Sequence, residues 1–396
     1  MRTLRVLRGR RTISVAAAIA AVMTLAAFSP AAKPAAVGSP PKLVVSTLLS
    51  GLDHPWDLAF TPDGTAMVYD ERVGRVWATP FPGIAPVLLG NLATLQTSPN
   101  FVAQGEGGVL GLAIDPSFAT NHYVYACYDT AVDVRVVRFT TNLIAGSLAI
   151  NAPIVTGMPV NTISGRHSGC RPRFRPGTNP PQLVIGTGDT ATDGTIPQNL
   201  QSLGGKVLCV LRDGTPCPGN PGITNPALDI DDRILSWGHR NVQGIALNAT
   251  GGGYSIEHGT DRDDEIDSLV PGNFGWNPVP NGGGTGYDES QPMTAPGGIA
   301  AAWSSGFPTI APSGGTMLAG TQWKRWNGSL AVAVLKAKEL LVVTFDSTGT
   351  AAIATTVAMN DLGYRLRSAV QGPDGNLYVS TDNGSATDVI YRVVPR

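Results

Sequence analysis

The stretch Leu58-Ala-Phe-Thr-Pro-Asp-Gly-Thr-Ala-Met-Val-Tyr69 carries the pattern that decides the fold. Two apolar runs flank a Pro-Asp-Gly turn, and this arrangement predicts a β-hairpin. A short apolar run, a turn rich in Pro, Asp or Gly, and a second apolar strand return along the chain in five further places: 112–127, 173–185, 245–256, 341–349 and 370–379. The sequence therefore predicts six hairpins.

Six hairpins in one chain of this length give one unit per roughly sixty residues. Radial repetition of such units leaves few open sheet edges, so we predict an all-β fold, a six-bladed β-propeller of four-stranded antiparallel blades. A two-sheet sandwich is the alternative. The longest gaps between hairpins, 190–235 and 270–310, are rich in Gly, Pro, Asn and Asp and are expected to be surface loops around a binding site. No linker divides the chain, so residues 37–396 are expected to form a single domain.

Composition supports this fold and excludes one class of partner. The chain holds 48 Gly and 31 Pro in 396 residues, with 42% apolar and only 14% charged residues. Short strands joined by turns fit these values better than long solvated helices do. The net charge of −1, with no basic run beyond the N-terminus, argues against nucleic acid as a partner, because phosphate binding needs a basic patch.

The N-terminus resembles an export signal. Five arginines precede an apolar run from Ile13 to Phe28, followed by small residues and prolines. We expect residues 1–36 to be a signal peptide and short leader, cleaved near residues 31–36, and the mature protein to be secreted or periplasmic without a transmembrane segment. The Arg10-Arg11 pair leaves both the general secretory route and twin-arginine export open.

Four cysteines in an exported chain predict disulfides. The Asp213-Gly214 turn can bring Cys209 and Cys217 together, which leaves Cys127 to pair with Cys170. A metal site is the alternative, but no CxxC spacing supports it.

His167 lies in the stretch Gly165-Arg-His-Ser-Gly-Cys-Arg171, among glycines and arginines. Because histidine titrates close to neutral pH, it can accept a proton from an alcohol, and the neighbouring glycines let a ligand approach the backbone. His167 is therefore the candidate general base. An ordinary polar loop is the alternative interpretation.

Several segments together resemble one family, the soluble quinoprotein glucose/sorbosone dehydrogenases. They are Gly51–Gly64, Gly105–Pro116, the His167 segment, Leu203–Leu208, Trp237–Gly244, Glu257–Ile266, Leu335-Lys336 and Arg365–Arg367, and they follow the family order over nearly the whole mature chain. The resemblance implies a six-bladed propeller that uses pyrroloquinoline quinone (PQQ) and calcium.

The resemblance also implies roles for individual residues. PQQ is a planar tricarboxylate, so its site needs cations that can pair with carboxylates. By similarity, Arg240 and Asn241 hold the cofactor near its quinone, and Lys336, Arg365 and Arg367 pair with its carboxylates. An Arg-x-Arg pair on a strand would point to one face, although a solvated strand face is the alternative for these two arginines. Glu106 stands where the family often has glutamine. In the loop of the third blade, Gln198 is the candidate for a polar contact to the cofactor, and Gln201 is the alternative.

For calcium, the resemblance points to the carbonyl oxygens of Gly259 and Thr260. The family has proline where this chain has Thr260. The following Asp263, Asp264 and Glu265 resemble a segment associated with further calcium, and a solvated turn is the equal alternative.

The implied reaction is the oxidation of a sugar, an aldose or a related polyol or aldehyde, with an aldose giving its lactone. His167 would take the hydroxyl proton while hydride passes to PQQ, calcium would polarise the quinone carbonyl, and Arg240 would stabilise the charge on its oxygen. Electrons would then leave to an external acceptor, a cytochrome or a quinone. Arg166 stands where the glucose-specific enzyme has an acidic residue, so its sugar preference does not carry over. A non-catalytic binding propeller and a calcium-dependent lactonase are the rival functions.

Overall fold

The computed structural model describes residues 38–83, 85–95, 99–281 and 283–396, and residues 38–396 form one compact unit. The signal peptide and leader predicted for residues 1–36 lie outside the described residues. None of the described helices is long and apolar enough to cross a membrane.

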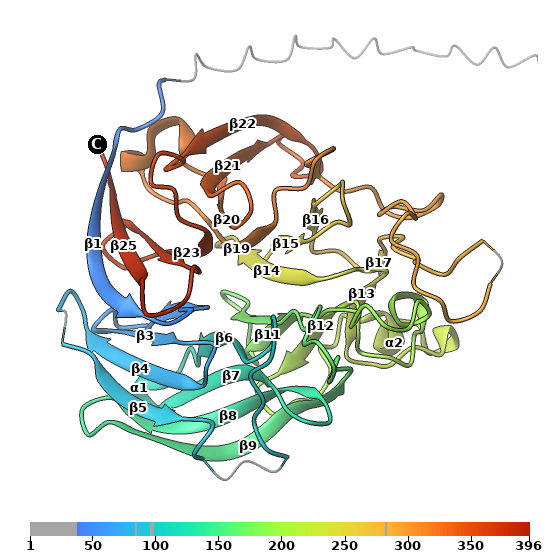
Figure 1. Cartoon of the computed structure of the whole chain (residues 1–396), viewed down its shortest axis with the longest axis horizontal. Helices are drawn as coiled ribbons and strands as arrows, with labels where there is room; N and C mark the ends of the chain where they lie inside the picture. The colour runs from blue at the N-terminus through green and yellow to red at the C-terminus, as the bar shows by residue number, and fades with distance from the viewer. Residues whose placement is uncertain (1–37, 84, 96–98, 282) are drawn as a thin grey trace, which may run out of the picture. The chain divides into compact units, whose positions relative to one another are not determined.

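The described chain is a six-bladed β-propeller, which confirms the predicted fold (Figure 1). The first three blades follow the chain in order from the axis outward. Blade 1 contains β2 (Leu58–Phe60), β3 (Ala66–Asp70), β4 (Arg75–Pro80) and β5 (Val87–Asn91); blade 2 contains β6 (Val109–Ile114), β7 (Tyr123–Asp129), β8 (Val134–Asn142) and β9 (Ser147–Met158); blade 3 contains β10 (Arg171–Phe174), β11 (Gln182–Gly186), β12 (Lys206–Leu211) and β13 (Ile234–Trp237).

The last three blades complete the ring. Blade 4 contains β14 (Val242–Leu247), β15 (Gly253–Glu257), β16 (Glu265–Ser268) and β18 (Trp303–Ser304); blade 5 contains β19 (Pro312–Met317), β20 (Leu330–Val334), β21 (Glu339–Phe345) and β22 (Ala352–Ala358); blade 6 contains β23 (Leu366–Gln371), β24 (Leu377–Thr381), β25 (Asp388–Pro395) and β1 (Leu43–Leu52). Because β1 pairs with β25, the two ends of the described chain close blade 6 together, and Figure 1 shows the two strands side by side.

Short elements decorate the blades. A two-residue strand, β17 (Gly272–Asn273), adds to blade 3 in parallel with β13, so this blade has a fifth strand beyond the predicted four. The helices are short: α1 (Phe118–Asn121), α2 (Pro221–Thr224) and the 3-10 helices η1 (Ile196–Gln198), η2 (Pro226–Leu228) and η3 (Thr321–Trp326).

All six predicted hairpins are present, but one has a different place in its blade. Five of them join the two innermost strands of a blade, whereas the hairpin at 341–349 joins the outer strands β21 and β22 of blade 5. The segment 190–235 was expected to be a loop, and this is wrong in part because it contains β12 and the start of β13. Its strand Lys206–Leu211 is short and follows a glycine-rich stretch, which hides it in the composition of the region.

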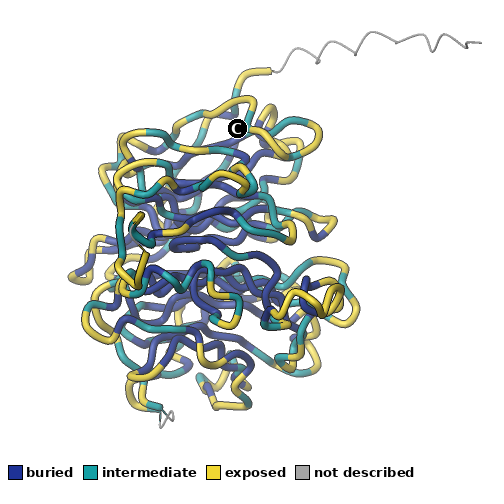
Figure 2. The backbone as a smooth tube through the Cα atoms, turned by 90° about the vertical axis from the view of Figure 1, so that its right-hand side faces the viewer, coloured by how far each residue is buried: buried dark blue, intermediate teal, exposed yellow. Residues whose placement is uncertain are grey.

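The innermost strands contact one another around a closed ring, in the order β2, β6, β10, β14, β19 and β23. Apolar side chains fill the spaces between blades, and the exposed residues gather on turns and loop tips (Figure 2). Both predicted disulfides are present, one joining Cys127 to Cys170 and the other Cys209 to Cys217.

Polar side chains occupy the centre of the ring. We call Trp56, Asp57, Arg171 and Arg367 the axial cluster. The guanidinium groups of Arg171 and Arg367 lie 4.2 and 5.4 Å from the ring centre of Trp56. Arg171 forms an ion pair with Asp57 and donates to the Gln243 carbonyl and the Ser368 hydroxyl. All four residues are buried.

Candidate active site

The predicted site residues gather at one end of the ring because of the topology. In a four-stranded antiparallel blade, the loop between the second and third strands and the connection to the next blade emerge at the same end. Loops of the first kind carry Gln198, Lys336 and residues 259–264, with Glu265 opening β16; connections of the second kind carry Glu106, His167, Arg240, Asn241 and Arg365. We call this end the mouth.

His167 and Asp189 form a buried dyad at the mouth. The Nδ1 atom of His167 lies 2.7 Å from Oδ1 of Asp189, and both side chains are buried. Burial alone would raise the pKa of Asp189, but the adjacent His167, its hydrogen bond and the charge of Arg240 hold that pKa below its ordinary value. The dyad therefore combines an ionised carboxylate with an imidazole that donates from Nδ1.

The tautomer fixed by Asp189 leaves Nε2 of His167 as the proton acceptor. Nε2 forms no hydrogen bond with any residue in the described part of the chain. The backbone of His167 adopts φ 52°, a conformation that non-glycine residues seldom adopt, and its N–H donates to Oε2 of Glu106 at 3.2 Å. At Gly188, a Cβ would overlap the His167 carbonyl oxygen, so only glycine allows this close approach.

Two aromatic side chains from the segment between β17 and β18 complete the contacts of Asp189. The indole N–H of Trp276 and the hydroxyl of Tyr287 both donate to Oδ2, at 2.7 and 2.8 Å. Burial and the nearby carboxylate raise the pKa of the Tyr287 hydroxyl, which therefore stays protonated as a donor. Asp189 is thus held on both oxygens, which fixes the orientation of His167.

Arg240 lies beside the dyad with part of its hydrogen-bonding capacity unused. It donates to the His258 carbonyl at 3.1 Å and to Oε1 of Glu289 at 3.1 Å, and its guanidinium lies 5.9 Å from the Trp276 ring centre. Its Nε, the Nδ2 of Asn241 and the Nε2 of His258 are buried without a hydrogen-bond partner. The three atoms belong to residues in direct contact with one another, so a polar ligand at this place could engage them together.

The imidazole of His258 lies near three of the predicted site residues. Burial, followed by the charges of Arg367, Arg240 and His167, lowers the pKa of its imidazole well below the ordinary value. Each of these three side chains thus lies near enough to act on one neutral ring. His167, Arg240 and Arg367 are thus three predicted site residues whose side chains surround His258.

The two arginines of blade 6 meet for a different reason from the one expected. Arg365 precedes β23, and Arg367 lies at an irregularity in the pairing of β23 with β24, so regular strand alternation does not align them. Both instead bind Asp382: Arg365 Nε donates to its carbonyl, and Arg367 pairs with its carboxylate. Arg367 also donates to Oε1 of Gln243 at 2.7 Å. It is buried, so a solvated strand face is excluded for Arg367.

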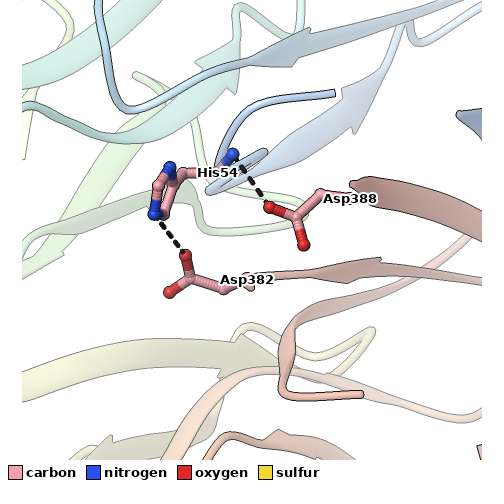
Figure 3. Close-up of side chains that lie close together, drawn as sticks. All are labelled: His54, Asp382 and Asp388. Carbon is pink, nitrogen blue, oxygen red and sulfur yellow. Dashed lines mark hydrogen bonds and ion pairs between the residues drawn. The ribbon is translucent and has the colours of Figure 1, made fainter. Parts of the chain in front are cut away.

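Asp382 is itself part of a small cluster that Figure 3 shows. The Nε2 of His54 lies 3.8 Å from Oδ1 of Asp382, and the His54 backbone N–H donates to Asp388. Oxygen and nitrogen atoms of the three side chains lie close enough to suggest a metal. Asp388, however, also accepts hydrogen bonds from Thr381 and from the backbone of residues 383 and 384, which makes it a structural acceptor.

The remaining predicted residues differ in their surroundings. Lys336 is exposed and donates to the Thr309 hydroxyl at 3.0 Å. Gln198 exchanges hydrogen bonds with Asn273 and donates to the Trp276 carbonyl at 2.8 Å, so it supports the aromatic segment of the dyad. Its rival Gln201 bonds to Asp229 on an exposed loop.

The acidic run after Gly259 and Thr260 is mostly buried, so the solvated turn does not describe it. The carboxylate of Asp264 accepts backbone N–H groups of residues 259, 310 and 311, which occupies both of its oxygens. Burial, with Glu257 adding, raises the pKa of Glu265 to about 8. Asp263 is partly exposed and accepts from Arg262 and Ser304. The loop therefore offers carbonyl oxygens and the Glu265 carboxylate to a cation, but not Asp264.

Five residues of the site were not predicted: Asp189, His258, Trp276, Tyr287 and Glu289. Asp189 lies three residues after the end of the buried strand β11, and an acidic residue close behind such a strand is a usable signal. Trp276, Tyr287 and Glu289 come from an irregular segment, and no local pattern marks them. His258 lies within a segment already quoted for the family resemblance, beside the expected metal carbonyls.

Comparisons with known proteins identify the family of this chain. The sequence matches the family model described as glucose/sorbosone dehydrogenase over residues 52–392. It is 30% identical to aldose sugar dehydrogenase YliI of Escherichia coli, over 90% of this chain and 94% of that protein, and 25% identical to quinoprotein glucose dehydrogenase B of Acinetobacter calcoaceticus, over 85% and 84%. The PQQ-bound structure of aldose sugar dehydrogenase from Streptomyces coelicolor superimposes with a TM-score of 0.69 at 30% identity, covering 90% of this chain and all of that one. The chain belongs to the glucose/sorbosone dehydrogenase family, whose members are oxidoreductases that act on sugars.

Proposed function

We propose that this protein is a PQQ-dependent dehydrogenase that oxidises an aldose, or a related polyol or aldehyde, at a hydroxyl next to His167. The observation that carries the proposal is the His167–Asp189 dyad beside the unpartnered buried atoms of Arg240, Asn241 and His258. A base oriented by a carboxylate, next to unused donors for an anion, suits the removal of a proton and hydride from an alcohol.

The donor set fits PQQ. Its quinone oxygens and three carboxylates need cations and N–H donors, and the buried Nε of Arg240 and Nδ2 of Asn241 are such donors. Lys336 and Arg365 would pair with carboxylates. Arg367 would act through its charge, since Asp382 and Gln243 engage its donors. Glu106 and Gln198 would support the site from its rim. When bound, PQQ supplies a quinone that accepts two electrons.

Calcium would be held by the carbonyl oxygens of Gly259 and Thr260. The carbonyls of Arg262 and Asp263 also lie close to the Gly259 Cα, where a Cβ would overlap them, so the loop gathers oxygen atoms. Glu265 could add a carboxylate, because a bound cation favours its ionised form over the protonated form that burial favours. Asp263 is accessible to a second cation, and Asp264 keeps the loop in shape.

The chain's own residues then perform definable steps. His167 accepts the substrate hydroxyl proton at Nε2, and Asp189 stabilises the resulting imidazolium through Nδ1. Trp276 and Tyr287 keep Asp189 in place. Arg240 presents positive charge where negative charge develops on an oxygen. An aldose oxidised at its anomeric carbon gives a lactone.

The rival functions fit the centre of the ring less well. A lactonase needs carboxylates that meet at a central metal, whereas here the guanidinium groups of Arg171 and Arg367 lie over the ring of Trp56 in the axial cluster. A binding module has no use for an oriented base. The two disulfides favour an extracytoplasmic location, so we propose a secreted or periplasmic enzyme that passes electrons to an external cytochrome or quinone.

The test is a titration of purified apo-protein with PQQ and calcium, followed by dye reduction with a panel of aldoses and polyols. Stoichiometric PQQ uptake and sugar-dependent dye reduction are expected. Failure to take up PQQ would favour the binding module, and lactone hydrolysis without PQQ would favour the lactonase.

A further inference from the structure

An ion-pair bridge spans the mouth next to His167. A single oxygen of Glu289, Oε1, accepts from Nη2 of Arg166 at 2.7 Å and from Nη2 of Arg240 at 3.1 Å. Arg166 precedes His167 in the chain, whereas Glu289 comes from the distant segment between β17 and β18. Two loops that are far apart in sequence are thus joined by charge beside the proposed base.

The bridge is accessible to a ligand. The side chains of Arg166 and Glu289 are 45% and 44% exposed, whereas Arg240 is only 5% exposed. Burial opposes the charge of Arg166, but the hydrogen bond and charge of Glu289, with Glu106 nearby, raise its pKa. Burial would raise the pKa of Glu289, but the two arginines lower it. Arg166 and Glu289 therefore carry opposite charges at neutral pH.

The position of Glu289 is fixed by its neighbours. Two residues earlier, the Tyr287 hydroxyl donates to Asp189 of the dyad at 2.8 Å. One residue earlier, the Asp288 carboxylate accepts the backbone N–H and the hydroxyl of Ser290, which closes a tight turn. These contacts anchor the backbone beside Glu289 near the dyad, and Arg166 and Arg240 hold its carboxylate.

The charge at the position of Glu289 determines whether the site favours charged or uncharged substrates. Without Glu289, Arg166 and Arg240 would present two uncompensated guanidinium groups, which would attract a carboxylate. With Glu289, one positive charge is neutralised, and an incoming anion would also face the repulsion of a fixed carboxylate. The remaining donors and acceptors suit the hydroxyl groups of an uncharged sugar.

We propose that Glu289 is a specificity-determining residue that, with Arg166, selects uncharged sugars and disfavours sugars that carry a carboxylate. This inference rests on the proposed function for the identity of the site and goes beyond it in naming the substrate class. The substitution Glu289→Gln keeps the shape of the side chain and removes its charge, so the variant should gain activity towards acidic sugars.

The test compares glucose with glucuronate, in which a carboxylate replaces the terminal hydroxymethyl group. With PQQ-loaded protein, the ratio of kcat/KM for glucuronate to that for glucose should rise about tenfold in Glu289→Gln, the size expected for one charge at a partly exposed site. Saturation-transfer NMR measures the binding of both sugars to the apo-protein without any turnover. The relative affinity for glucuronate over glucose should rise in the same variant.

Matched variants separate charge from shape. Arg166→Gln leaves Glu289 and should shift the ratio towards glucose, and the double variant Arg166→Gln with Glu289→Gln should lie between the two single variants. Thermal unfolding checks that each variant is folded.

An unchanged preference in Glu289→Gln, or equal changes for both sugars, would overturn the inference. Absence of PQQ-dependent turnover with every sugar would instead contradict the proposed function, and the NMR binding arm would still decide the inference.

Discussion

The axial cluster and the mouth use the same residue types under opposite conditions. In the axial cluster, Arg171 has an ion-pair partner and three further acceptors, and the side chain is completely buried. At the mouth, Arg240 retains a buried Nε without a partner. A buried cation whose donors all have acceptors stabilises the ring of blades. A buried cation with an unused donor can still bind a ligand. The hydrogen-bond partners of the guanidinium group, not the residue type, thus distinguish Arg171 from Arg240.

Two aspartates show the same contrast. Burial opposes the charge of Asp57, but Arg171 and Arg173 hold its pKa below the ordinary value. Burial raises the pKa of Asp129, next to the His167 segment, to about 7, with the Ser168 hydroxyl opposing and Glu106 adding to the shift. The mouth therefore contains a carboxyl group that titrates near neutrality, whereas the Asp57 carboxyl of the axial cluster is held in its ionised form.

The largest effect is expected at His167. Substitution of His167 by Ala should lower turnover by roughly two to four orders of magnitude, the usual effect of losing a general base, with PQQ uptake nearly unchanged. Steady-state dye reduction and a PQQ titration measure the two quantities. Turnover within threefold of the parent would remove His167 from the role of base.

A substitution in the axial cluster should change the stability of the protein and not its turnover. Arg171→Met leaves Asp57 buried with one partner fewer, and the free energy of unfolding should fall by about 3 kcal/mol. Urea unfolding measures this. Arg166→Met is the matched control at the mouth, where the side chain is half exposed, and it should change stability by less than roughly 0.5 kcal/mol. Equal losses in the two variants would erase the distinction between the regions.

Asp129 offers a test with a defined pH dependence. Its folded pKa of about 7 exceeds the ordinary value of 3.8, so the folded state binds more protons than the unfolded state, and stability falls as pH rises between these values. Asp129→Asn removes this loss and should be more stable than the parent by on the order of 2 kcal/mol at pH 8, with no gain at pH 4. Asp213→Asn, on an exposed turn, should show no such rise. A gain independent of pH would contradict the account.

The smallest effect is expected at Arg365, which lies near the rim and bonds to the Asp382 carbonyl. Arg365→Ala should weaken PQQ binding about tenfold, the equivalent of one charge-assisted hydrogen bond, and change kcat of the loaded enzyme little. Quenching of tryptophan fluorescence measures the affinity. A loss confined to kcat would place Arg365 near the reacting atoms instead.

The fold could be predicted because its signals are local. A turn such as Thr61-Pro-Asp-Gly64 between apolar runs specifies a hairpin without reference to the rest of the chain. The place of a hairpin within its blade is not local, which explains why 341–349 proved to be an outer hairpin.

The site was only partly predictable for the same reason. His167 and Arg240 stand in recognisable segments, but Tyr287 and Glu289 reach the dyad from an irregular segment that has no sequence period. Arg367 shows the opposite error. The sequence suggested that it contacts a ligand, whereas Asp382 and Gln243 already bind its guanidinium group. Partners that are distant in sequence decide both cases.

The most direct test of the account is a crystal structure of the protein soaked with PQQ and calcium. We predict that the cofactor ring lies at the mouth, with oxygen atoms within hydrogen-bonding distance of Arg240 and Asn241 and with Nε2 of His167 facing its reactive carbonyl. A cofactor bound elsewhere, or a His167 ring turned away from it, would contradict the central claim.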